Sequence, residues 1–206
     1  MLKAWFKLIP ISLVSSTNVL EKLPSSKEMY QGGLYVGVFE PGVSTVLGNA
    51  NTGTAQTYKS VKNKNGTGVK RWVLILAPED ITVNMLKMYN KNTSNYDGFY
   101  NMNKTNIPNI TGININGFKD WYIPSKQELE FIFNNIPKNY ETVGFKPLLQ
   151  KYYLTSTFFD IPLQNKNFIY AQSNLSQNYG NIFITSELQN LNNVTLRLVR
   201  RIELGN

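Results

Sequence analysis

The side chains in this chain that could do chemistry are carboxylates, lysines and tyrosines, because the sequence contains neither cysteine nor histidine. Thiol nucleophiles, disulfides and zinc sites built from thiolate or imidazole are therefore excluded. Ser-His-Asp catalysis and the usual general base near neutral pH are excluded for the same reason. Without a disulfide, packing or assembly has to stabilise the fold.

Four carboxylates could in principle supply the pair of acids with which a glycosidase protonates the leaving group and attacks or activates water. They are Glu128, Glu130, Glu141 and Asp160. No two of them share a recognisable motif, and Glu128 has a better explanation as part of a helix cap. We therefore predict that the chain is not an enzyme and has no catalytic residue. Because no clustered ladder of acidic and amide side chains appears, we also predict no metal ion and no cofactor.

The element with the clearest sequence signal is a helix over residues 126–135. Ser125-Lys126-Gln127-Glu128 is a capping box, in which the first and last side chains satisfy each other's backbone N–H groups. Apolar residues then follow at the spacing of one helix face, at Leu129, Ile132, Phe133 and Ile136. Pro137 ends the helix.

Two β-strands are expected before this helix. Residues 34–39 follow a Gly-Gly pair and stop at Pro41-Gly42, a turn dipeptide. Residues 71–77 form a near-continuous apolar run, which indicates a strand buried on both faces. Further along, residues 80–90 are interpreted as a short helix and residues 91–116 as an Asn-rich loop.

Short strands are expected after the helix, over residues 152–157, 167–172 and 181–185. The last strand, residues 194–202, alternates in character. It places Val194, Leu196 and Leu198 on one face and Thr195, Arg197, Val199 and Arg201 on the other. The chain therefore reads as α+β, with one or two helices packed on a small, irregular, mostly antiparallel sheet.

Residues 117–131, Gly-Phe-Lys-Asp-Trp-Tyr-Ile-Pro-Ser-Lys-Gln-Glu-Leu-Glu-Phe, resemble a signature of the collagen-like adhesin C-terminal domain family, which occurs in bacterial surface proteins and phage virion proteins. Two further blocks, residues 153–157 and 196–201, are similar to that family's pattern and follow in the same order. Residues 32–37 and 72–75 also resemble the first strands of phage members, so the likeness covers residues 30–204. The chain departs at Thr155, where the family has Ser, and at Tyr122, where it has Arg.

The resemblance implies a C-type-lectin-like fold, distantly related to formylglycine-generating enzymes and to phage tropism determinants. Those enzymes use cysteines, which this chain lacks, so their activity is excluded. Trp121 is expected in the core, and Asp120 is expected to cap a turn or to pair with Arg197 or Arg200. The signature is expected to maintain the fold while the loops carry function. It comprises Gly117, Asp120, Trp121, Pro124, Ser125, Glu128, Leu129, Arg197 and Arg200.

Residues 1–28 are predicted to form an extended N-terminal arm, and residues 29–206 are predicted to form one globular domain. Lys3 and Lys7 precede a short apolar patch as in a signal peptide, but Pro10 interrupts the patch and no small-residue cleavage site follows. Because exposed apolar surface implies an interface, we expect the arm to anchor the domain to other virion proteins or to copies of itself. The anchoring residues are Trp5, Phe6, Leu8, Ile9, Ile11 and Leu13. No stretch of the sequence is long and apolar enough for a transmembrane segment.

The formal net charge of +8 would attract nucleic acid, anionic lipid or acidic polysaccharide. The positive residues are scattered, however, and form neither a basic helix nor an Arg-rich run. We therefore predict no specific nucleic-acid partner; a nucleic-acid binder would instead lose affinity steeply with salt.

Together, these features predict a phage structural protein on the virion exterior, in a tail, fibre or capsid decoration, whose lectin-like domain adheres to a host-surface glycan or envelope protein. Aromatics flanked by Asn and Ser suit adaptable recognition. The candidate ligand-binding residues are Tyr96, Phe99, Tyr100, Phe158, Phe159, Asp160 and Tyr179. Phe158 and Phe159 could instead belong to the core and Tyr179 to a turn. The alternatives are a head or tail decoration or assembly protein without ligand recognition, and a bacterial adhesin at the cell surface. A homo-oligomer or a larger assembly is expected.

Overall fold

The computed structural model of the protein describes residues 23–25, 27–44, 58–62, 68–81, 93–104, 110, 112–161, 166–173, 180–184 and 194–204. The predicted anchoring residues of the arm, from Trp5 to Leu13, lie outside these ranges. The end of the predicted arm belongs with the globular part. The Lys27 amide donates to the Tyr35 carbonyl, and the Tyr35 amide donates to the Glu28 carbonyl.

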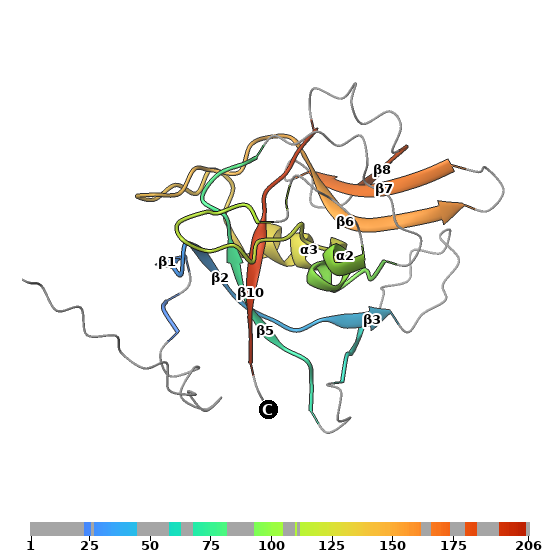
Figure 1. The fold of residues 1–206 in the computed structure, drawn as a ribbon, viewed down its shortest axis with the longest axis horizontal. Helices are drawn as coiled ribbons and strands as arrows, with labels where there is room; N and C mark the ends of the chain where they lie inside the picture. The colour runs from blue at the N-terminus through green and yellow to red at the C-terminus, as the bar shows by residue number, and fades with distance from the viewer. Residues whose placement is uncertain are drawn as a thin grey trace, which may run out of the picture.

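The first sheet has four antiparallel strands in the order β1-β2-β5-β10 (Figure 1). These strands are β1 (Met29–Tyr30), β2 (Gly33–Phe39), β5 (Trp72–Leu76) and β10 (Val199–Glu203). The predicted strands 34–39 and 71–77 are thereby confirmed. The expectation that the second is buried on both faces is confirmed too, because every residue of β5 is buried.

Strand β5 is apolar throughout because each face of the sheet carries its own core. Val73 and Ile75 point to a cluster that also contains Trp121, Ile123 and residues of the second sheet. Trp72, Leu74 and Leu76 point to the other cluster, which contains the buried face of the main helix. A strand between two cores has no solvent face, which explains the absence of alternation in its sequence.

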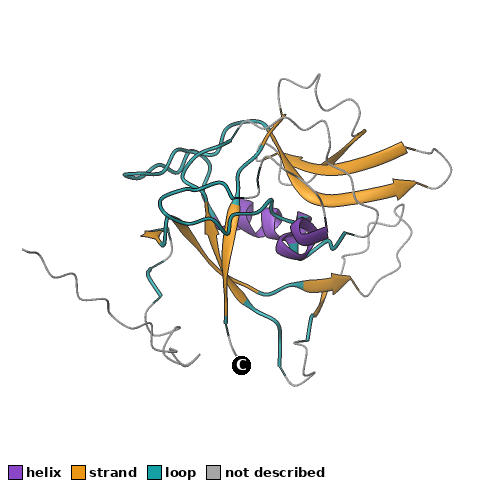
Figure 2. Cartoon of the chain, viewed as in Figure 1, coloured by secondary structure: helices purple, strands orange, loops and turns teal. Residues whose placement is uncertain are grey.

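The predicted helix over residues 126–135 is confirmed as α3 (Lys126–Asn135). The Glu128 amide donates to Ser125 Oγ at 3.3 Å, and the Ser125 amide donates to Glu128 Oε2 at 2.8 Å, so the capping box is formed. Leu129 and Ile132 are fully buried against the first sheet. Figure 2 shows the helices lying between the two large sheets, in agreement with the contacts of α3 with β2, β6 and β7.

A second helix, α2 (Gly98–Lys104), occupies part of the segment that was predicted to be a loop, so that prediction is wrong. Asp97 caps it, because its Oδ1 accepts from the Tyr100 amide at 2.8 Å. The buried Asn101 holds the helix to the second sheet by donating to the Ser94 carbonyl and to Ser156 Oγ. A seven-residue, Asn-rich helix has no apolar repeat to reveal it. Most of the helix predicted over residues 80–90 lies outside the described residues.

The second sheet has the order β8-β7-β6-β9, in which β6 pairs antiparallel with β7 and parallel with β9. Its strands are β6 (Tyr152–Ile161), β7 (Lys166–Ser173), β8 (Gly180–Ile184) and β9 (Val194–Thr195). They confirm the three strands predicted after the helix. A separate two-stranded sheet joins β3 (Gly42–Ser44) to β4 (Tyr58–Ser60).

The prediction of a single alternating strand over residues 194–202 is wrong. Val194 and Thr195 pair with β6 in the second sheet, whereas Val199 to Glu203 pair with β5 in the first. Between these strands the chain passes from one sheet to the other, and residues 196–200 are all buried. Burial on every side removes the alternation that the sequence pattern implied.

The fold is therefore mixed α+β, with few helices and mostly antiparallel strands, as the sequence predicts. Within the described ranges, no helix is long and apolar enough to cross a membrane.

Candidate functional site

The signature residues Asp120 and Arg200 form an ion pair that connects the segment before α3 to the C-terminal strand. Arg200 Nε donates to Asp120 Oδ1 at 2.9 Å, and Nη2 donates to Oδ2 at 3.0 Å. The guanidinium also lies 3.9 Å from the ring centre of Phe118 and donates to the Gln31 carbonyl. Of the two partners that the sequence allows for Asp120, the structure selects Arg200.

Arg197 has a different role, because its side chain is buried and pairs with Asp80. Its Nη1 donates to the carbonyls of Ala77 and Lys146, each at 3.1 Å, and Nη2 donates to the Pro147 carbonyl at 3.1 Å. One buried guanidinium thus holds two chain segments, at Ala77 and at Lys146–Pro147, through three backbone oxygens. Such a residue stabilises the fold and is not available to a ligand.

The remaining signature residues are also structural in their contacts. Trp121 is 4% exposed, and its indole N–H donates to the Phe118 carbonyl, so the expectation of a core position is confirmed. Gly117 has φ +87°, a backbone conformation that favours glycine, in the turn between Ile115 and Phe118. The Pro124 carbonyl accepts from the Ser156 amide at 2.8 Å.

Glu128 is fully buried at the point where α2 and α3 begin. Its Oε2 accepts from the amides of Gly98 and Ser125, at 3.0 and 2.8 Å, and its Oε1 accepts from Tyr122 Oη at 2.8 Å. Burial raises the pKa of Glu128, although its hydrogen bonds to Ser125 and Tyr122 act to lower it. A carboxyl enclosed by these three donors, without exposure to solvent, has no route to a substrate.

Three of the predicted ligand-binding aromatics, which lie within five residues of sequence, are at the start of α2. Phe99 is 37% exposed, Tyr100 is 45% exposed, and Tyr96 is partly buried beside them. We call this surface, made by Tyr96, Phe99 and Tyr100, the α2 face. Exposed aromatic rings offer flat apolar area on which a sugar ring or a protein side chain can stack.

The other predicted ligand-binding residues do not join the α2 face. Phe158 is 7% exposed and packs in the first core cluster, so its assignment to an exposed surface is wrong, and the alternative of a core residue is correct. The backbones of Phe159 and Asp160 pair with β7, and their side chains lie outside the described part of the structure. Tyr179 also lies outside it.

Two cations stack on aromatic rings next to the α2 face, an arrangement that was not predicted from the sequence. The Arg201 guanidinium lies 4.4 Å from the ring centre of Phe99 and 4.9 Å from that of Trp72. Lys70 Nζ lies over Trp72 at 5.2 Å. Asp97 accepts from both cations, each at 2.7 Å. Lys70 and Arg201 stand 27 and 104 residues from Asp97 in sequence, so no local pattern could reveal this cluster.

The charges below the α2 face are balanced. Two cations, Lys70 and Arg201, meet two carboxylates, Asp97 and Glu203. Burial acts to raise the pKa of Asp97, but the hydrogen bond from Lys70 and the charge of Arg201 outweigh it and hold that pKa below its ordinary value. Asp97 is therefore ionised at neutral pH. A surface with balanced charge favours stacking and hydrogen bonding over attraction to a highly charged ligand.

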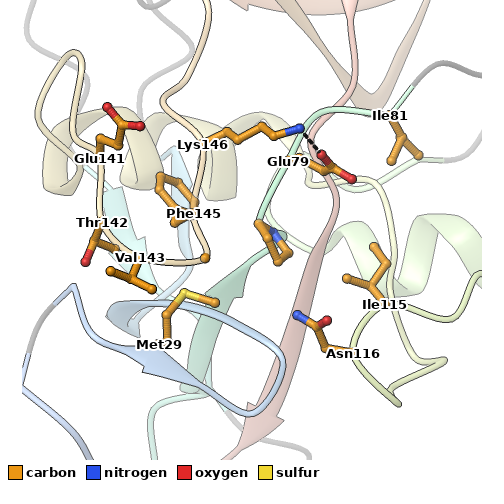
Figure 3. Close-up of a pocket in the computed structure, with 12 residues that line it drawn as sticks. Met29, Glu79, Ile81, Ile115, Asn116, Glu141, Thr142, Val143, Phe145 and Lys146 are labelled. Atoms are coloured by element: carbon orange, nitrogen blue, oxygen red, sulfur yellow. Dashed lines mark hydrogen bonds and ion pairs between the residues drawn. The ribbon is translucent and has the colours of Figure 1, made fainter.

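A groove of about 860 Å³ opens elsewhere, between the loop after α3 and the turn at residues 115–118 (Figure 3). We call it the Val143 groove, because Val143 is 93% exposed at its edge. Its apolar lining is Met29, Pro78, Ile81, Ile115, Val143 and Phe145, and its polar lining is Glu79, Asn116, Glu141, Thr142 and Lys146. Glu79 and Lys146 form an ion pair at one end. The volume falls within the range of pockets that hold small ligands or a few side chains.

Among the described residues, no three acidic side chains gather as metal ligands would. Comparison with known proteins gives no relative to set beside this geometry: no family model matches the chain, and neither a curated protein nor a solved structure matches it.

Proposed function

We propose that this chain is a non-enzymatic recognition module with a C-type-lectin-like fold, carried on the exterior of a phage virion. The proposal rests on which segments of the sequence the structure brings into contact. The first of the three sequence blocks that resemble the collagen-like adhesin C-terminal domain family, residues 117–131, is joined to each of the other two, 153–157 and 196–201, by specific contacts.

Each contact links one block to another. Asp120 pairs with Arg200, and the backbones of Tyr122 and Val199 exchange two hydrogen bonds, at 2.7 and 2.9 Å. The Lys126 amide at the start of α3 donates to Thr157 Oγ1 at 3.0 Å. The three blocks therefore lie in one part of the fold, as the blocks of a single motif would. Their convergence supports one structural motif and, through it, the fold and the virion or surface setting that the resemblance implies.

The use of the acidic residues supports a role in binding without catalysis. Glu128 is buried under three donors, and Asp97 and Asp80 are each held by arginine. Of the other candidates for a glycosidase pair, Glu130 lies 3.7 Å from Lys126 on the same helix. Acids held in this way stabilise structure, whereas a catalytic acid and base need contact with the substrate.

The α2 face is the recognition surface in this proposal. Phe99 and Tyr100 present exposed rings on α2. The Asp97 cap and the contact between Arg201 and Phe99 make this helix rigid. Rigid aromatic residues give contact area at a low entropic cost. With the charges beneath them balanced, the ligand class that fits is a neutral host-surface glycan or an uncharged patch of an envelope protein.

The test measures binding of the labelled full-length chain to intact cells of a panel of bacteria, at low and at high salt. We expect saturable binding to some strains that survives high salt, and a dissociation constant raised about tenfold by Tyr100→Ala, because truncation of a central aromatic anchor commonly costs more than 1 kcal/mol. Leu149→Ala is the matched control, because Leu149 is 46% exposed and is not part of the α2 face.

Three results would count against the proposal. Binding that disappears at high salt would indicate attraction by the net positive charge alone. Equal losses in the Tyr100 and Leu149 variants would remove the α2 face as the recognition surface. An absence of binding to every strain would favour a decoration or assembly role without ligand recognition, for which the exposed apolar lining of the Val143 groove is the supporting feature.

A further inference from the structure

The Val143 groove is a second candidate contact surface, independent of the α2 face and of the proposed function. Val143 is 93% exposed and Met29 is 38% exposed, and they face Ile115 across the groove (Figure 3). Apolar side chains grouped in a concave surface favour an apolar occupant, because covering them removes that area from water.

The chain itself supplies an apolar segment close to the groove. The described N-terminal part begins at Leu23, which packs against the first core cluster, and six residues later Met29 lines the groove. Residues 5–13 contain Trp5, Phe6, Leu8, Ile9, Ile11 and Leu13. Leu13 lies ten residues before Leu23, and a connection of that length reaches up to about 33 Å when extended. The arm can therefore return to the groove of its own molecule.

The charges of the two partners are complementary. Lys3 and Lys7 flank the first aromatic residues of the arm. Glu141 is exposed on the rim of the groove, whereas Glu79, at one end, already pairs with Lys146 of the same lining. Glu141 is therefore the acidic group of the groove that opposes Lys3 and Lys7. Pro10 disfavours a continuous helix through the segment.

We propose that residues 5–13 of the N-terminal arm dock in the Val143 groove of the same molecule. Docking in the same molecule is favoured because a short tether gives the arm an effective concentration of millimolar order. The contact removes the apolar side chains of the arm from water in the unassembled protein. An assembly partner that displaces the arm from the groove would expose both apolar surfaces at the same time.

Cysteine cross-linking of the full-length chain tests the proposal against a clean background, because the sequence contains no cysteine. The test variants carry Leu8→Cys or Ile11→Cys together with Val143→Cys. Val143 is almost fully exposed, so its replacement removes no packing. The control combines Leu8→Cys with Glu203→Cys. Glu203 is exposed, and its strand partner Trp72 lies at the opposite end of β5 from Pro78, which lines the groove. Under mild oxidation we expect at least one test pair to form an intramolecular disulfide about ten times faster than the control pair.

Several outcomes would overturn the proposal. Equal rates in test and control pairs would show that the arm does not prefer the groove. Disulfide-linked dimers that form in proportion to protein concentration would assign the groove to the arm of a second copy. A cross-link between Leu86→Cys and Val143→Cys, without any at Leu8 or Ile11, would assign it to the apolar segment that follows Ile81.

A second measurement needs no disulfide. In Val143→Lys, the new charge opposes Lys3 and Lys7, so trypsin should cut after Lys7 about tenfold faster than in the parent chain, as expected for a tenfold rise in the population of the undocked arm. Leu149→Lys adds the same charge at an exposed site outside the groove and should leave the cleavage rate unchanged. Equal acceleration in both variants would contradict docking. Cell binding through the α2 face is measured separately, so a failure of the docking proposal can be distinguished from a failure of the proposed function.

Discussion

Arg200 and Asp120 form a two-point ion pair in which the two partners differ in their environment: the Arg200 side chain is 8% exposed, whereas that of Asp120 is 47% exposed. The guanidinium also stacks on Phe118 and donates to the Gln31 backbone, so it binds the first sheet to the segment that leads into α3. Removal of the arginine should therefore lower the free energy of unfolding more than removal of the carboxylate does.

We expect Arg200→Lys to lower the free energy of unfolding by about 2 kcal/mol, because a lysine cannot reproduce the paired hydrogen bonds or the stacking. Asp120→Asn should cost about 1 kcal/mol, since the half-exposed carboxylate is screened by solvent. Urea unfolding of each variant measures both values. Lys119→Ala, at an exposed neighbouring position, serves as the control and should change stability by less than about 0.5 kcal/mol. An Arg200→Lys protein as stable as the parent would refute this assignment.

Replacement of Glu128 should separate its hydrogen bonds from its charge. Glu128→Ala leaves the Gly98 amide, the Ser125 amide and the Tyr122 hydroxyl without their acceptor, and should cost roughly 3–5 kcal/mol. Glu128→Gln keeps an acceptor oxygen of the same size and should cost about 1 kcal/mol. Urea unfolding near pH 5 measures the difference. Equal losses in the two variants would mean that the charge of Glu128, and not its hydrogen bonds, stabilises the junction.

The raised pKa of Glu128 predicts a loss of stability as pH increases. The folded state holds this proton more tightly than the unfolded state, so the contribution is complete below the ordinary value of 4.5 and is lost as pH rises through the folded pKa. Glu128→Gln removes that titration. We therefore expect the stability of the variant, relative to the parent, to improve between pH 4 and pH 7. A relative stability that does not change with pH would contradict the raised pKa.

Asp97 should show the opposite dependence. Its pKa is lowered in the folded state, so its contribution is present above the ordinary value of 3.8 and is lost as pH falls below that value. Thermal unfolding followed between pH 5 and pH 2 should show a decline that Asp97→Asn reduces. The variant should also weaken the helix cap at Tyr100 and the stack at Arg201, which a lower unfolding temperature at pH 7 would report. An unchanged acid limb in Asp97→Asn would assign the decline to other carboxylates.

Gly98 allows a steric test of the junction between the two helices. A Cβ at this position would lie 2.5 Å from the Ile123 carbonyl and 2.7 Å from Glu128 Oε2. Gly98→Ala should therefore destabilise the protein by about 3 kcal/mol. Gly112→Ala is the matched control: φ at Gly112 is +82°, but no atom lies within 4 Å of the new Cβ, so only backbone strain of about 1 kcal/mol is expected. Chemical denaturation of both variants decides between steric overlap and loss of glycine flexibility.

The sequence by itself determined the elements whose causes are local. Helix α3 has its start in the Ser125–Glu128 capping box and its buried face in the spacing of Leu129 and Ile132, both within one or two turns of chain. Strand β5 is apolar at every position, which already indicated burial on both faces. The mixed α+β class and the core position of Trp121 could likewise be predicted from patterns of a few residues.

Only the tertiary structure decided the relationships between residues far apart in sequence. It chose Arg200 over Arg197 as the partner of Asp120, it buried Phe158, and it placed Arg201 between Trp72 and Phe99. It also divided the last predicted strand between two sheets, because residues 196–200 cross from one core to the other. The physical reason is that periodicity and capping act within about one or two turns of chain, whereas an ion pair or a ring stack depends on which segments the fold brings together.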